Sequence, residues 1–256
     1  MGTNRRNGSL FTNIHNGVAT VEFGHPAGNS FVSELLIRLE TELRTLSGNE
    51  EANIIVLRSE GEGAFCAGAS LDELLAISDV EEAKVFFAGF AGVINTMRNC
   101  SKPIIGRIQG KAVGGGVGLL AACDYVFATE TASIRLSELS IGIAPLVIAA
   151  AVERKTGKTG LAELSLSPEE WKTAYWAKEK GLYTRVFEKL TELDKELDFF
   201  VQRLASYSPE ALQALRAVLW EGTEHWDSLL FERAAISGRL SLTPKARQAL
   251  EKFRKK

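Results

Sequence analysis

The chain has 256 residues, of which 45% are hydrophobic and 24% are charged, and its formal net charge is -2. This balance is typical of a globular protein and gives no reason to expect a nucleic-acid-binding surface. No apolar run is long enough to span a bilayer, and the first ten residues lack the apolar stretch of a secretory signal, so we expect a cytoplasmic protein without membrane association. Three unclustered cysteines and three scattered histidines predict reduced thiols and no histidine-based metal site.

The first part of the chain alternates between segments of strand character and segments of helical spacing. A hairpin is predicted over residues 11–23, because alternating residues surround Asn16-Gly17, a dipeptide that favours a tight turn. Leucines at helical spacing predict a helix from Ser33 to Leu46. We expect the following elements next: strand 53–57, helix 80–97, strand 103–108, helix 119–123 and strand 124–129. Because strands alternate with helices up to about residue 145, the sequence predicts an α/β fold.

Beyond Pro168 the pattern is helical nearly throughout, except at residues 183–187. Ser208-Pro209 and Thr243-Pro244 each place a capping residue before a proline at the first helical position, which indicates two helix starts. This last part of the chain is therefore predicted to be a helical region.

A glycine-rich segment from Lys111 to Asp124, KAVGGGVGLLAACD, needs a functional or structural reason. Its second half fits the G-x-G-x-x-A dinucleotide fingerprint, but Glu138, at the spacing of the acidic partner, lies well beyond the predicted strand end at Thr129. A phosphate-binding P-loop around Gly157-Lys-Thr would need a glycine where Val152 stands, so these residues read better as a helix boundary.

The third interpretation is an oxyanion hole, in which two backbone N–H groups point at one oxygen that gains negative charge. Glycines at a helix start allow close approach of a substrate and add the positive end of the helix dipole. The second donor would come from the loop of residues 61–70, which consists mostly of small residues and leads into a predicted helix.

Three segments, AFCAGASLDEL, KPIIGRIQGKAVGGGVGLLAACD and SELSIGIAP, resemble in order and spacing the crotonase (enoyl-CoA hydratase/isomerase) superfamily. The resemblance runs from about Val18 to about Phe187 and more loosely to the C-terminus. It implies a crotonase-like α/β fold of repeated ββα units, acyl-CoA substrates, and no cofactor apart from the coenzyme A of the substrate. It also implies that residues 1–190 form the core with the active site. Residues 191–256 would form a C-terminal helical region that makes a homotrimer or a dimer of trimers.

The same resemblance assigns roles to individual residues. Ala69, after the Ala-Gly pair of the first segment, and Gly115, the middle glycine of the triple, would supply the two oxyanion N–H groups. Glu138 matches one of the two glutamates of typical family hydratases, whereas Gly118 stands where the other is usual. Substrate contacts would come from Ala27, Ala67, Ser70, Leu71, Val113, Gly114, Gly118, Ser137 and Ile141, although the family commonly has Asp where Ser70 stands.

A single carboxylate leaves the reaction open. Hydration of a branched or carboxylated enoyl-CoA ranks first, because GVGLLAACD with LSELSIGIAP resembles bacterial methylglutaconyl-CoA hydratases, which would place the protein in leucine or fatty acid metabolism. Double-bond isomerisation, with Glu138 moving a proton between Cα and Cγ, ranks second. Decarboxylase, thioesterase and non-catalytic crotonase-like roles remain. A carboxylated acyl group would need a cation, for which Arg135 and Arg154 are near in sequence, although an exposed role is favoured for each.

Overall fold

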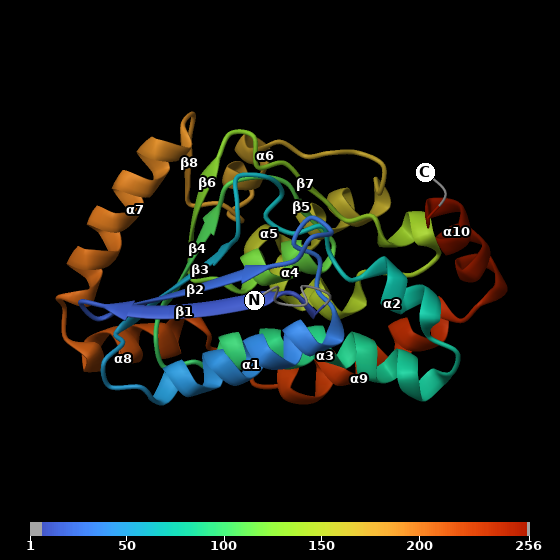
Figure 1. The fold of residues 1–256 in the computed structure, drawn as a ribbon, viewed down its shortest axis with the longest axis horizontal. Helices are drawn as coiled ribbons and strands as arrows, with labels where there is room; N and C mark the ends of the chain where they lie inside the picture. The colour runs from blue at the N-terminus through green and yellow to red at the C-terminus, as the bar shows by residue number, and fades with distance from the viewer. Residues whose placement is uncertain (1–6, 255–256) are drawn as a thin grey trace, which may run out of the picture.

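The computed structural model describes residues 7–254, and its strands form a six-stranded sheet and a two-stranded sheet (Figure 1). The order in the larger sheet is β1-β2-β3-β4-β6-β8. The first pair is an antiparallel hairpin of β1 (Ser9–His15) and β2 (Val18–Gly24), and Asn16 and Gly17 both have the positive φ that its tight turn requires. The remaining strands pair in parallel: β3 (Ile54–Ser59), β4 (Ile104–Ile108), β6 (Tyr125–Thr129) and β8 (Arg185–Phe187).

The smaller sheet consists of β5 (Ala112–Val113) and β7 (Ile134–Arg135), which pair in parallel so that Val113 lies beside Arg135. Helices connect and surround the strands. In chain order they are α1 (Ser33–Gly48), α2 (Leu71–Ala76), α3 (Val80–Asn99), α4 (Gly115–Ala122), the 3-10 helix η2 (Glu138–Ile141), α5 (Leu146–Leu166), α6 (Ala174–Glu179), α7 (Leu190–Ala205), α8 (Pro209–Leu219), α9 (Trp226–Ser241) and α10 (Pro244–Arg254).

The central strands of the larger sheet are buried on both faces, as expected for parallel strands. Alternate residues of β3 show this directly. Ile55 and Leu57 belong to the main core with leucines of α1, whereas Ile54 and Val56 belong to a second core that α7 covers. Figure 1 shows α7 on one side of the sheet and α1, α3 and α9 together on the other.

The predicted α/β fold is confirmed, together with the hairpin and the helix boundaries at Ser208 and Thr243, whose side chains accept hydrogen bonds from Ala211 N and Ala246 N. The predicted break at Gly157 is also present, since this residue has φ 67° within the span of α5. The helix after the glycines begins earlier than predicted, because the segment from Gly115 to Gly118 is itself helical.

All three cysteines are buried and unpaired. No helix within residues 7–254 is long and apolar enough to cross a membrane. The predictions made on the first six residues, where a secretory signal would begin, lie outside the described residues.

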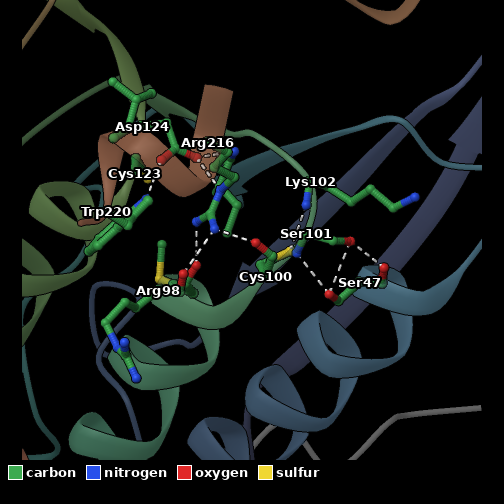
Figure 2. A network of polar contacts seen from close by, with 12 residues as sticks. Ser47, Arg98, Cys100, Ser101, Lys102, Cys123, Asp124, Arg216 and Trp220 are labelled. Carbon is green, nitrogen blue, oxygen red and sulfur yellow. Dashed lines mark hydrogen bonds and ion pairs between the residues drawn. The ribbon is translucent and has the colours of Figure 1, made fainter. Parts of the chain in front are cut away.

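A buried polar network attaches the C-terminal helices to the core (Figure 2). The carboxylate of Asp124, just after α4, accepts hydrogen bonds from Arg216 Nε of α8 at 2.9 Å and from Trp220 Nε1 at 2.6 Å. It also accepts one from the backbone N–H of Ile104 at 2.7 Å. The rest of the Arg216 guanidinium donates to the backbone carbonyls at the end of α3, those of Met97, Arg98 and Cys100. One side chain from the C-terminal region thereby satisfies carbonyls at the end of α3 and pairs with the carboxylate that follows α4.

Candidate active site

A cavity of about 140 Å³ lies between the two glycine-containing loops, η2 and the helices α3, α5 and α9. A single water needs roughly 10–15 Å³ by the same measure, so this space can accept an organic ligand. Nine of the twelve site residues predicted from the sequence line this cavity: Ala67, Ala69, Leu71, Val113, Gly114, Gly115, Ser137, Glu138 and Ile141.

Backbone pairing brings the two loops together. Cys66 forms an isolated parallel bridge with Ala112, and the N–H of Val113 donates to the carbonyl of Cys66 at 2.9 Å. Gly68, two residues after Cys66, has φ +95°, and a Cβ on it would lie 3.2 Å from the carbonyl oxygen of Val113. A glycine is needed at this point because the chain turns in a conformation that side chains disfavour, and the turn delivers Ala69 to the cavity wall.

Two backbone donors face this cavity without an acceptor. Within residues 7–254, neither the N–H of Ala69 nor that of Gly115 has a hydrogen-bond acceptor. Gly115 is the first residue of α4, where an N–H has no partner within the helix and the positive end of the dipole lies. A Cβ on Gly115 would come within 2.2 Å of Cε1 of Phe90, so only glycine fits beneath that ring. Such a pair of donors can stabilise an oxygen on which negative charge develops.

The small sheet carries Glu138 to the same place. The N–H of Gly114 donates to the carbonyl of Arg135 at 3.0 Å, which extends the β5–β7 pairing toward η2. A Cβ on Gly114, which has φ +51°, would lie 2.9 Å from Oε1 of Glu138. The carboxylate therefore lies directly over the residue that precedes the Gly115 donor.

The environment of Glu138 favours the protonated form of its carboxyl. Its Oε2 is buried without a hydrogen-bond partner, and no Lys, Arg or His lines the cavity within the described residues. Burial away from water raises the pKa of Glu138 to about 7, against the smaller opposing effect of a backbone hydrogen bond. Near neutral pH such a group can both remove and return a proton.

Three predicted site residues do not line the cavity. Ser70 is buried and caps α2, since its Oγ accepts a hydrogen bond from the N–H of Glu73 at 3.3 Å. Ala27 is exposed on a loop whose next residue, Gly28, accepts a hydrogen bond from the N–H of Ala67 at 2.9 Å. Ala27 therefore lies on a loop that is hydrogen-bonded to the cavity wall at Ala67.

Gly118 is the third of these residues, and it does not line the cavity. It is buried within α4, and a Cβ there would lie 2.3 Å from Cγ2 of Ile148 on α5. Ile148 itself lines the cavity. An apolar side chain therefore fills the space next to position 118, and no second carboxylate fits there while Ile148 is present.

Sequence reasoning missed the remaining cavity wall. It comes from α2, α3, the segment before and within α5, and α9: Leu74, Phe87, Phe90, Ala144, Pro145, Leu146, Val147, Ile148 and Ser237. Nothing in their helical spacing separates a residue facing a cavity from one in a solid core. The two candidate cations lie elsewhere, because Arg135 stacks on Trp171 and Arg154 stacks on Trp220, with guanidinium-to-ring distances of 4.6 and 3.8 Å.

The chain is similar in sequence and in structure to known proteins. The sequence model of the family described as "Enoyl-CoA hydratase/isomerase" matches residues 13–243. The peroxisomal Δ(3,5)-Δ(2,4)-dienoyl-CoA isomerase of Arabidopsis thaliana is 27% identical, over 77% of this chain and 74% of the relative. The mitochondrial methylglutaconyl-CoA hydratase of Rattus norvegicus is 31% identical, over 77% of this chain and 63% of the relative. The crystal structure of an enoyl-CoA hydratase from Mycobacterium avium superposes with a TM-score of 0.84 at 27% identity, covering 96% of both chains.

Proposed function

The chain belongs to the enoyl-CoA hydratase/isomerase family, and from this premise we propose that it moves the double bond of an apolar enoyl-CoA thioester, with Glu138 as the single proton carrier. The observation that carries this proposal is the composition of the cavity wall. Glu138 is its one ionisable side chain among the described residues, and Ile148 occupies the space beside Gly118. Isomerisation needs one group that takes a proton and returns it, and this wall supplies one.

The proposed reaction begins with the thioester oxygen between the N–H groups of Ala69 and Gly115. The Glu138 carboxylate removes a proton from Cα of a 3-enoyl-CoA, and the electron pair delocalises onto the thioester oxygen. The two N–H groups stabilise this dienolate, and losing one such donor typically lowers the rate about 10²–10³-fold. The neutral Glu138 then returns the proton to Cγ, which leaves the double bond between Cα and Cβ. Only a proton moves, so the proposed reaction uses no further cofactor.

The apolar cavity wall also indicates which charge the acyl group can carry. Neither Arg135 nor Arg154 reaches the cavity, and a second carboxylate buried among apolar side chains without a cation is strongly unfavourable. We therefore propose an uncharged acyl group. A carboxylated one, as in the name of the methylglutaconyl-CoA hydratases, receives no support from this wall.

Hydration is the second candidate, and the curated hydratase relatives favour it. Here Glu138 would deprotonate a water that attacks Cβ and would pass the same proton to Cα, so one carboxyl group could serve both steps. Hydration differs from isomerisation because it requires an ordered water beside Glu138, within a largely apolar cavity.

An ultraviolet assay of the conjugated enoyl thioester separates the two reactions. We expect absorbance to rise with a 3-enoyl-CoA substrate and to stay constant with the matching 2-enoyl-CoA. Loss of absorbance with the 2-enoyl-CoA would establish hydration instead. Glu138→Gln is expected to abolish the change, whereas Glu130→Gln, which alters an exposed carboxylate, should leave it intact. Full activity in the Glu138 variant would refute both mechanisms.

Assembly into a trimer, or a dimer of trimers, is a further part of the proposal. Exposed apolar side chains on α8 and α9 support it, namely Leu215, Val218, Leu219, Phe231 and Ile236. Exposed apolar groups can mark a surface that a partner subunit covers.

A further inference from the structure

Two hydroxyl side chains on the cavity wall, those of Ser137 and Ser237, have no part in the proposed reaction. Side-chain oxygens on this wall come from Ser137 and Glu138 at the start of η2 and from Ser237 on α9. Ser237 is 1% exposed, and its hydroxyl has no hydrogen-bond partner within residues 7–254. A buried hydroxyl without a partner is unfavourable, so a ligand that pairs with it would gain affinity.

A second serine on the same helix does have a hydrogen-bond partner, so the unpaired hydroxyl is particular to position 237. Ser241 lies one turn further along α9 and is also 1% exposed. Its Oγ donates to the carbonyl of Gly238 at 2.8 Å, the usual way in which a helical serine satisfies its hydroxyl. Ser237 makes no such bond and lines the cavity, whereas Ser241 does not line it.

Ser237 is offset along α3 from the residue whose ring covers Gly115. Helices α3 and α9 run antiparallel, since Asn95 Nδ2 of α3 donates to the carbonyl of Trp226 and a Cβ on Gly238 would meet the backbone of Ala83 and Lys84. Ser237 is therefore level with the first turns of α3. Phe90, the ring over Gly115, lies about six residues further along α3, roughly 9 Å at 1.5 Å per residue. A ligand atom that meets Ser237 thus belongs to the far end of an acyl group whose thioester is at Gly115.

We propose that Ser237 determines specificity by binding an uncharged oxygen, a hydroxyl or a carbonyl, near the distal end of the acyl group. A carboxylate is disfavoured there because no Lys or Arg side chain lines this cavity in the described part of the chain. The inference rests on the proposed binding of an acyl-CoA, and it names the class of acyl group that the cavity prefers.

The test uses calorimetric binding of saturated acyl-CoA thioesters, which cannot react. Hexanoyl-CoA is compared with 5-oxohexanoyl-CoA and 6-hydroxyhexanoyl-CoA on the full-length wild type, Ser237→Ala and the matched control Ser241→Ala. We expect the wild type and the control to bind at least one oxygen-bearing thioester about tenfold more tightly than hexanoyl-CoA. In Ser237→Ala this ratio should fall to about one, while hexanoyl-CoA keeps its affinity.

The outcomes separate this inference from the proposed function. A wild type that binds all three thioesters with equal affinity overturns the role of Ser237 and leaves the proposed function standing. An equal ratio in the wild type and Ser237→Ala does the same. Failure of the wild type to bind any of the thioesters overturns the proposed function, and the role of Ser237 with it.

Discussion

Burial of Glu138 should make the stability of the folded protein depend on pH in a defined way. The pKa of this carboxyl rises from 4.5 to about 7 on folding, so the folded chain holds its proton more tightly than the unfolded chain. Where the folded state binds more protons, stability falls as pH rises. The loss therefore begins near pH 4.5 and is complete slightly above pH 7. At about 1.4 kcal/mol per pKa step, the total is about 3 kcal/mol.

The substitution Glu138→Gln removes the titration but keeps a similar shape. Its free energy of unfolding, relative to that of the wild type, should increase by about 2–3 kcal/mol between pH 5 and pH 8. Urea denaturation at the two pH values measures this, with the fluorescence of the buried Trp220 and Trp226 as the signal. Glu130→Gln, at an exposed position, is the matched control and should show no such change. A difference between Glu138→Gln and wild type that is equal at both pH values would show that this carboxyl is solvated, and would refute the argument for its raised pKa.

Two further substitutions test the packing that defines the site and the core. Gly118→Glu should abolish folding or lower the melting temperature by more than 10 °C, because Ile148 occupies the space and no cation lies beside the new carboxylate. Equal melting temperatures for this variant and the wild type would contradict this packing. Asp124→Asn should cost about 3–5 kcal/mol in urea denaturation, since it leaves the Arg216 guanidinium buried without its counter-charge. Glu196→Gln removes the counter-charge of Arg185 from an ion pair whose two side chains are 39% and 42% exposed, and it should cost less than about 1 kcal/mol. Similar losses for both variants would contradict this difference between a buried and an exposed ion pair.

The sequence predicted those features that depend on local chemistry. Asn16-Gly17 specified its hairpin because both residues adopt the positive φ of a tight turn. Pro209 after Ser208 marked a helix start because proline fixes the first helical φ and serine satisfies a free N–H. Each of these outcomes depends on two or three adjacent residues and on nothing distant.

The helical part of the cavity wall depends on contacts between distant helices, which local patterns do not encode. Phe90, Ile148 and Ser237 lie on three different helices, and each fits the ordinary helical spacing of its own segment. The role of Gly118 also depends on a contact that local sequence patterns do not encode. As a glycine in a catalytic motif it suggested a ligand contact, but its small size accommodates Ile148, thirty residues away in sequence.

The Arg216 network also has a consequence for how the chain is made. During synthesis the N-terminal part emerges first, and α3, α4 and Asp124 are complete well before α8 exists. Until residue 216 arrives, the last carbonyls of α3 and the Asp124 carboxylate lack the donors of the Arg216 guanidinium. A nascent chain that ends near residue 190 therefore carries an open polar pocket at the place where α8 will dock. The core is expected to reach its final rigidity only when the C-terminal helices have left the ribosome.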